Sequence, residues 1–310
     1  MLEQFRKPKI EDWELIASYM HRFPGANCAK SVGNVILWSD FYQVEFMIYN
    51  NTLLLRSRTE ETPYYFAFPI GEDEDVRQVI AELIEMAKKA GEKLQFYVVT
   101  KDEFEKMDAW FPGTFEIEYD RNDADYVYEV EKLATLKGKK YQAKRNHINR
   151  LCANYEDRWE YEPISKENVT ECIEMLHKWY LQKEVAEDAK EQEAEIIVAE
   201  KSLMYFEELH FRGGLLRIDG EVVAFCVGER ACQKTFIVHI EKAFADIQGA
   251  YPLINQQFVQ NELLGKYEYV NREEDMGLEG LRKAKLSYHP AFLLEKGLVT
   301  CKSDTCKGEE

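Results

Sequence analysis

Carboxylate and histidine side chains gather in the last third of the chain, near segments whose pattern predicts β-strands. Glu229 ends VVAFCVGE, His239 and Glu241 lie in TFIVHIEKA, and Asp275 follows YEYVN. Side chains two positions apart on a strand point to the same face, so His239 and Glu241 are predicted to share one. A histidine and a glutamate on one face form a plausible proton-handling pair. The alternative is a histidine whose hydrogen bonds are satisfied within the sheet.

Acyl transfer to an amine or hydroxyl is the chemistry that these residues suggest. It needs a base that takes the proton of the nucleophile and donors that stabilise the developing oxyanion. We predict direct attack on the acyl donor without a covalent enzyme intermediate, with Glu241 or Asp275 as the base. The alternative is that each carboxylate only pairs with a nearby cation.

A cluster of basic residues precedes this region. Between Lys132 and Arg150 the sequence has seven lysines and arginines and no acidic residue. If the segment is a helix with about 100° per residue, Lys144 and Arg145 flank its apolar face and lean toward the protein body. The segment therefore predicts contact of these two residues with an anionic ligand such as a phosphorylated donor or a tRNA backbone. The alternative is a solvated helix whose long side chains only cover apolar surface.

The elements that position these residues follow one order in both halves of the chain. Two strands joined at Asn50-Asn51 precede a third strand, a helix over 72–91 and a further strand. In the second half, two strands joined at Asp219-Gly220 precede TFIVHIEKA, a helix after residue 249 and YEYVN. Asn-Asn and Asp-Gly are turn signals of hairpins. The repeat predicts an α+β fold of two tandem domains, 1–135 and 136–310, with the boundary after a strand that includes 125–133.

Five segments resemble a known family. They are DYVYEVEKLATLKGKKYQAKRNHINRL at 125–151, GEVVAFCVGER at 220–230, VHIEKA at 238–243, GAYPLINQQF at 249–258 and NREEDMGLEGLRKAKLSYHP at 271–290. They are similar to uncharacterised bacterial proteins that match the C-terminal domain of phosphatidylglycerol lysyltransferases. These proteins belong with the Gcn5-related N-acyltransferases (the GNAT fold) and the Fem-type aminoacyl ligases. The resemblance implies two tandem acyltransferase-like domains, each a mixed, mostly antiparallel sheet flanked by helices.

The resemblance also implies roles for further residues. The helix that starts near Gly249 would offer backbone N–H groups to a phosphate of the donor. Arg272 belongs to the polar family motif, Lys285 would hold a phosphate or acyl carboxylate, and Tyr288 would protonate the leaving group. The alternative for Lys285 is a cation that complements a helix C-terminus. The loop ADIQGAYPL has one glycine and a bulky Tyr251, which departs from the glycine-rich loop of enzymes that use acetyl-CoA.

Composition limits the remaining possibilities. The net charge of −17 over 310 residues argues against a general nucleic-acid or anionic-membrane binder, although a local basic patch can still act. No apolar run is long enough for a membrane span and the N-terminus lacks a signal peptide, so we expect a cytoplasmic protein without an integral membrane segment. The scattered cysteines lack CxxC spacing, and we predict no metal site.

The donor and the acceptor stay open at this point. An aminoacyl-tRNA donor is favoured because the loop departs from the CoA-binding pattern and a basic helix is present, with acyl-CoA as the alternative co-substrate. The acceptor could be a small molecule, a peptide or a lipid headgroup. A second class of function is a non-catalytic ligand-binding module that has kept the fold, because fold alone does not imply function.

Overall fold

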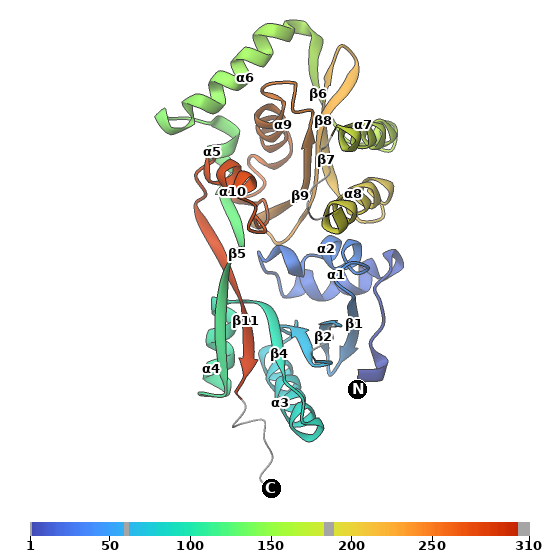
Figure 1. The fold of residues 1–310 in the computed structure, drawn as a ribbon, viewed down its shortest axis with the longest axis vertical. Helices are drawn as coiled ribbons and strands as arrows, with labels where there is room; N and C mark the ends of the chain where they lie inside the picture. Colours follow the sequence, from blue (N-terminus) through green and yellow to red (C-terminus); the bar gives the residue numbers. More distant parts are fainter. Residues whose placement is uncertain (1, 59–61, 183–188, 303–310) are drawn as a thin grey trace. The chain divides into compact units, whose positions relative to one another are not determined.

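The chain folds into two compact units that interleave along the sequence. The computed structural model describes residues 2–58, 62–182 and 189–302, and Figure 1 traces its helices and strands. The first unit holds residues up to 125, 274–282 and from 293 onward, and the second holds 126–273 and 283–292. The domains predicted from the sequence, 1–135 and 136–310, are continuous, whereas each compact unit takes residues from separate parts of the chain.

The strands of the first unit lie in the order β1-β2-β3-β4-β11-β5. Their bounds are β1 (Val44–Tyr49), β2 (Thr52–Ser57), β3 (Tyr65–Ala67), β4 (Gln95–Thr100), β5 (Phe115–Glu129, which continues into the second unit) and β11 (Phe292–Cys301). Neighbouring strands pair antiparallel in β1–β2, β2–β3 and β4–β11, whereas β3 and β4 are parallel. The helices are α1 (Trp13–Arg22), α2 (Val32–Leu37), α3 (Asp73–Ala90) and α4 (Lys101–Trp110).

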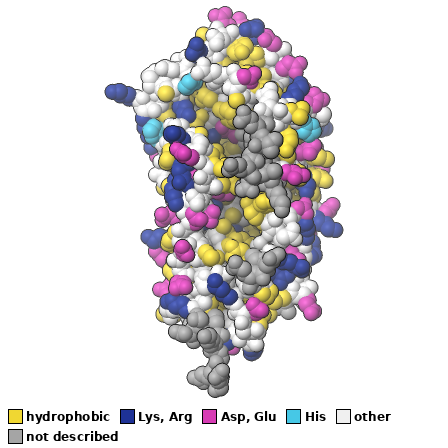
Figure 2. Space-filling view, viewed as in Figure 1, with side chains coloured by type: hydrophobic (Ala, Val, Ile, Leu, Met, Phe, Trp, Pro, Cys, Tyr) yellow, Lys and Arg dark blue, Asp and Glu magenta, His cyan; other side chains and the backbone are white. Residues whose placement is uncertain are grey.

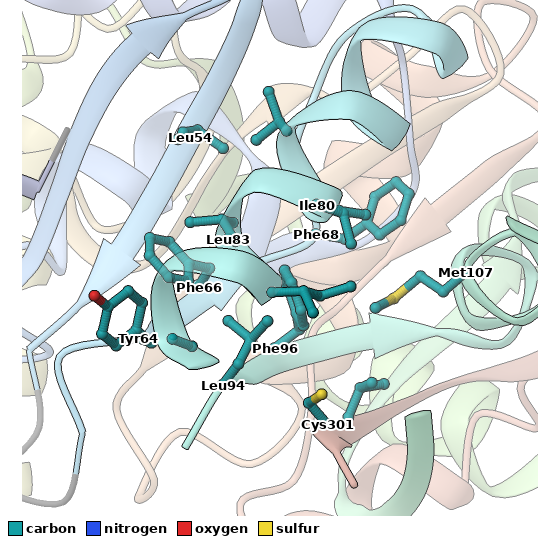
Figure 3. Packing of buried hydrophobic residues seen from close by; sticks show 14 of the residues in the cluster. Leu54, Tyr64, Phe66, Phe68, Ile80, Leu83, Leu94, Phe96, Met107 and Cys301 are labelled. Atoms are coloured by element: carbon teal, nitrogen blue, oxygen red, sulfur yellow. The ribbon is translucent and has the colours of Figure 1, made fainter. Parts of the chain in front are cut away.

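Helix α3 connects the parallel strands of the first unit and covers its core. Its first turn is acidic and its last turn is basic, as the helix dipole favours, and Gly91 ends it with a left-handed φ of 67°. Ile80 and Leu83 of α3 are fully buried and lie against Phe66 and Phe96 of the sheet (Figure 3). The helical period of apolar residues therefore gives this helix one face, which the sheet buries.

The second unit repeats this arrangement. Its strand order is β5-β10-β9-β8-β7-β6. The strand bounds are β6 (Trp159–Pro163), β7 (Arg212–Ile218), β8 (Glu221–Arg230), β9 (Thr235–Ala243) and β10 (Tyr269–Asn271). All neighbours pair antiparallel except β9 and β10, which are parallel.

Helices cover both faces of this second sheet. They are α5 (Val130–Thr135), α6 (Gln142–Tyr155), α7 (Val169–Leu181), α8 (Ala189–Met204) and α9 (Ala250–Phe258), and α10 (Glu279–Leu286) has residues in both units. Helix α9 lies against one face and α7 and α8 lie on the other (Figure 1). The predicted fold class, mixed and mostly antiparallel sheets flanked by helices, is confirmed in both units.

The predicted turns are present, and one predicted strand ends earlier than expected, within the longer strand β5. Asn50, Asn51, Asp219 and Gly220 all have positive φ angles, as tight hairpin turns require. The strand predicted over 125–133 ends at Glu129, where helix α5 begins. Within the described residues, no helix is long and apolar enough to span a membrane.

The parallel pair of the second unit opens after three residues. Thr235, Phe236 and Ile237 of β9 pair with β10, and the rest of β9 pairs only with β8 among the described strands. The β8–β9 register shifts at the same place, because Val227 faces Ile240 and Gly228 faces Val238, which leaves His239 unmatched. A β-bulge bends a strand and increases its twist, and β10 ends at Asn271, opposite Ile237, just before the bulge. Beside His239 and Glu241, β9 therefore has no backbone pairing with β10, and we call this end of the parallel pairing the β9–β10 gap.

Candidate functional site

An ion pair between side chains bridges the gap between β9 and β10. Arg272, directly after β10, places Nη2 2.8 Å from Oε1 of Glu241 on β9. The two side chains are only 11% and 12% exposed. Where the sheet loses its backbone hydrogen bonds, a buried cation and a buried anion thus hold the strands together. Removal of either side chain would leave the other charge buried without its partner, which is strongly destabilising.

Two polar atoms of this bridge are buried without a hydrogen-bond partner among the described residues. They are Nη1 of Arg272 and Oδ1 of Asn255 on helix α9, whose Nδ2 donates to Oε2 of Glu241 at 3.0 Å. Buried polar atoms are nearly always satisfied, so these two atoms, on residues that both contact Glu241, are candidates for contact with a ligand. Sequence reasoning missed Asn255. Its signal is a polar residue on the buried face of an otherwise apolar helix segment.

Two tyrosine rings support the guanidinium. The Cζ atom of Arg272 lies 4.8 Å from the ring centre of Tyr288 and 5.7 Å from that of Tyr128. Burial raises the pKa of both hydroxyls well above the usual value for tyrosine. Lys285 donates from Nζ to the backbone oxygen of Arg272 at 2.6 Å. Lys285 therefore positions the chain after β10, and its binding of a phosphate or acyl carboxylate, which the resemblance implies, stays a prediction.

Lys144 is the remaining cation of this group. It is half-buried in the first turn of α6, and its Nζ lies 3.9 Å from the ring centre of Tyr288. Burial and the positive charge of Arg272 lower the pKa of Lys144 to about 8, and the opposing effect of Glu241 is smaller. Its inward lean, predicted from helix geometry, places it beside the Arg272–Glu241 pair.

Three other predicted ligand-binding residues have structural contacts. Arg145 donates to the backbone oxygens of Leu136 and Gly138 and so holds the loop before α6. Gly249 begins α9 with a φ of 103°, and a Cβ there would lie 2.6 Å from the backbone oxygen of His147 on α6. Burial raises the pKa of Tyr251, the next bulky residue of that loop. No described contact brings Arg145 to the Arg272–Glu241 pair, whereas the charge of Glu241 adds to the raised pKa of Tyr251.

His239 does not pair with Glu241 but lies between two other carboxylates. Its Nδ1 is 2.8 Å from Glu273 and its Nε2 is 3.0 Å from Glu229. Burial alone would lower the pKa of His239, but the two hydrogen bonds outweigh it and raise the pKa to about 9. The ring is therefore a buried imidazolium at neutral pH, which cannot accept a proton.

Asp275 lies in the first unit, where arginines surround it. Its carboxylate is fully buried and accepts hydrogen bonds from Nε and Nη2 of Arg282 at 2.8 and 2.7 Å. Nη1 of Arg121 lies 3.3 Å from Oδ2 of Asp275. These contacts make Asp275 a stabilising partner of two arginines. Because it belongs to the first unit, we do not assign it the role of base in the second.

A second buried charged cluster lies in the first unit and was missed from the sequence. Nζ of Lys296, whose side chain is 2% exposed, lies 2.7 Å from Oδ1 of Asp125, 3.3 Å from Oε2 of Glu274 and 3.6 Å from Sγ of Cys28. Cys28, Asp125 and Glu274 are spaced as metal ligands. The ammonium of Lys296 already supplies the cation between them, and the carboxylates and the thiol keep its pKa raised despite burial. Sequence patterns gave no signal, because the four residues are far apart in the chain.

Comparison with known proteins gives a consistent result. A family model described as the C-terminal region of phosphatidylglycerol lysyltransferase matches residues 21–299. A conserved protein of unknown function from Bacteroides thetaiotaomicron is 36% identical, with a TM-score of 0.88 over 96% of this chain and 99% of that one. The structure of L-PGS from Bacillus licheniformis has a TM-score of 0.64 at 15% identity, covering 96% and 93% of the two chains.

A curated relative is also similar. An uncharacterised protein of Mycoplasmoides gallisepticum is 26% identical over 198 residues, which is 61% of this chain and 60% of that protein. The family resemblance predicted from the sequence is thus confirmed over most of the chain.

Proposed function

Because the chain belongs to the phosphatidylglycerol lysyltransferase C-terminal family, we propose that its second unit transfers an activated acyl group to an amine or hydroxyl acceptor. The observation that carries the proposal is the gap between β9 and β10, with Nη1 of Arg272 and Oδ1 of Asn255 buried and unsatisfied there. A carbonyl oxygen would accept from Arg272, and an N–H or O–H group of a substrate would donate to Asn255. Such preorganised donors stabilise the oxyanion that forms when an acyl carbonyl is attacked.

The donor that fits best is an aminoacyl ester of the kind carried by tRNA. A free amino group next to the carbonyl gives Asn255 Oδ1 a donor, and the negative charge of Glu241 lies within hydrogen-bond distance of the same amide. Acyl-CoA is disfavoured, because the carbonyl oxygen of His147 lies close to Gly249 at the start of α9. This oxygen brings negative charge to the place where CoA-dependent relatives would bind phosphate.

A non-catalytic ligand-binding module is the second candidate. The observation that favours it is the complete pairing of His239 with Glu229 and Glu273, which removes one predicted base from the chemistry. A binding module would hold an acyl or amino compound at Arg272 and Asn255 without turnover. The two candidates differ in whether acyl groups leave the donor.

The test is transfer of a labelled acyl group by the full chain. Charged tRNAs and acyl-CoA thioesters are supplied as donors, with small amines, peptides and lipid headgroup alcohols as acceptors. We expect transfer from aminoacyl-tRNA, and a decrease of about 10²–10³-fold in the Arg272→Gln variant, the usual effect of removing an oxyanion donor. The matched control is Arg158→Gln, an arginine of the same unit with a 54% exposed side chain, which should transfer at the wild-type rate.

The outcomes separate the candidates. If the Arg272→Gln variant is folded by circular dichroism and keeps the wild-type rate, the proposed role of Arg272 is wrong. Tight binding of aminoacyl-tRNA without turnover would favour the non-catalytic module. Transfer from acyl-CoA alone would keep the reaction class and overturn the donor.

A further inference from the structure

The acyl transfer proposed above needs a proton acceptor, and none of the predicted bases is available in the second unit. Glu241 is held in the ion pair with Arg272 and accepts from Asn255. His239 is a buried imidazolium between two glutamates. Tyr288, which the resemblance implies as the proton donor to the leaving group, has a buried hydroxyl with a raised pKa, so it keeps its proton at neutral pH and is not a base. A different group must take the proton.

Lys144 has the position that this role requires. Its Nζ makes no hydrogen bond or ion pair with any residue that the structure describes, and it lies 3.9 Å from the ring centre of Tyr288. The guanidinium of Arg272, which carries the unsatisfied Nη1, lies 4.8 Å from the centre of the same ring. The amine and the proposed carbonyl donor thus both contact the ring of Tyr288.

We propose that Lys144 is the general base of this site and accepts the proton of the attacking amine or hydroxyl while Arg272 holds the acyl carbonyl. The inference rests on the proposed function. As the nucleophile bonds to the carbonyl carbon, its proton passes to the neutral amine of Lys144 and the carbonyl becomes an oxyanion hydrogen-bonded to Nη1. When the tetrahedral intermediate collapses, the bond to the leaving oxygen breaks, and that oxygen takes the proton back from Lys144. No further reactant is needed.

The surroundings of Lys144 make the neutral amine accessible near physiological pH. Three side chains face it: Arg272 directly after β10, Glu241 on β9 and Tyr288 after α10. Burial and the charge of Arg272 favour the neutral form and exceed the effect of Glu241, which sets the pKa at about 8. A base works best when its pKa is close to the working pH. Transfer should therefore rise with pH and level off above about 8, as Lys144 loses its proton.

A measurement that does not need turnover tests the first requirement. Lysines of the full chain are reductively methylated with ¹³C-formaldehyde, and the resonance that disappears in Lys144→Arg is followed from pH 6 to 11. We expect a midpoint near 8, and an upward shift in Arg272→Gln, because that change removes the neighbouring positive charge. A midpoint at or above the ordinary lysine value near 10.4 would overturn the inference, since the ammonium would then keep its proton.

Kinetics test the role itself. Lys144→Gln should lower kcat by about 10²–10⁴-fold with little change in KM, and the inflection near pH 8 should disappear. Lys144→Arg, which keeps the charge but cannot accept a proton, should fail equally. The matched control is Lys178→Gln on α7, whose side chain is 60% exposed, and it should keep both rate and pH profile.

The outcomes for the two proposals can be distinguished. If the wild-type chain transfers acyl groups and Lys144→Gln keeps its rate and inflection, the role of Lys144 is wrong and the proposed function stands. If the wild-type chain transfers nothing from any donor, the proposed function fails, and the role of Lys144 fails with it.

Discussion

At the scale of single residues, the second unit separates two kinds of buried charge. His239 has both ring nitrogens occupied by carboxylates, so its charge serves stability. Arg272 and Asn255 each keep one polar atom unsatisfied. A fully satisfied network makes a fold more specific, whereas an unsatisfied buried atom costs free energy and persists where a ligand completes it. The presence or absence of hydrogen-bond partners for the buried polar atoms thus distinguishes His239, which is structural, from the proposed site at Arg272 and Asn255.

The raised pKa of His239 predicts how stability changes with pH. Because the folded-state pKa of about 9 lies above the ordinary histidine value of 6.5, the contribution is fully present below about pH 6.5. It is lost as pH rises from there through about 9, and the shift corresponds to roughly 3 kcal/mol. We expect urea unfolding at pH 6, 7.5 and 9.5 to show this loss in the wild-type chain.

A histidine substitution isolates this effect. His239→Gln should be destabilised at pH 6 and should lack the part of the pH dependence between 6.5 and 9. The control is His177→Gln, at a histidine whose side chain is 52% exposed, and it should follow the wild-type curve. A His239→Gln curve parallel to the wild-type curve would show that the ring is neutral in the folded state.

At the scale of elements, regular patterns predicted the fold and an irregularity decided the site. The helical period gave α3, Gly249 gave the start of α9, and the turn residues at Asn50-Asn51 and Asp219-Gly220 gave both hairpins. Alternation on a strand placed His239 with Glu241, but the bulge at His239 and the glutamates at 229 and 273 gave the two side chains different partners. Bulges leave little trace in a single sequence, since they depend on the neighbouring strand.

Other parts of the site depend on contacts that no local pattern encodes. Lys144 could be placed on the inner side of its helix from geometry alone, and in the structure it is half-buried beside Tyr288. Arg145 beside it has a similar angle, yet it binds the carbonyls of Leu136 and Gly138, because the loop before α6 folds back over it. The cluster around Lys296 joins residues from distant parts of the sequence, and only tertiary structure brings them together.

The bulge makes Gly228 on β8 a sensitive position. A Cβ at this residue would lie 2.0 Å from the backbone oxygen of Ile237 and 2.7 Å from the ring of Phe236. Gly228→Ala should therefore destabilise the chain by roughly 2–3 kcal/mol, since backbone on β9 must move. The measurement is the urea midpoint. The same displacement should lower acyl transfer, because Ile237 is the last residue of β9 that pairs with β10.

A second glycine provides the comparison. A Cβ at Gly280 in α10 would meet no atom within 4 Å, and Gly280→Ala should stabilise the chain by about 0.4–1 kcal/mol. Equal stability of the two alanine variants would mean that β8 and β9 adjust to the added methyl group, and that the bulge is not fixed by close packing.

At the scale of the whole molecule, the negative net charge repels a polyanionic donor, and one basic segment is the exception. The net charge is −17, and acidic and basic side chains are interspersed over the face shown in Figure 2. Within 132–150, Lys137, Lys139, Lys140 and Arg150 are exposed and so remain free to meet a phosphate backbone. Lys144, in the same segment, faces the site. The segment therefore joins a local positive surface to the proposed chemistry.

This arrangement predicts how donor binding depends on salt. Replacing Lys137, Lys139, Lys140 and Arg150 by Gln should weaken binding of aminoacyl-tRNA. It should also reduce the slope of log affinity against log salt by up to about 3, because binding releases fewer counterions when fewer phosphates are contacted. Filter binding between 50 and 300 mM salt measures both quantities. The rate of transfer at saturating donor should not change, since none of the four side chains reaches Arg272.

A variant with the same net charge separates a local surface from the general field of the molecule. Lys89, Lys166, Lys178 and Lys266 are exposed outside the basic segment, and their replacement by Gln makes the chain equally more acidic. If long-range repulsion alone governed binding, both variants would weaken it to the same extent. A local contact surface requires that only the first variant changes the salt slope. Identical slopes in the two variants would show that tRNA does not bind the face formed by 132–150. The chemistry at Arg272 and Lys144 would then require a donor of smaller charge.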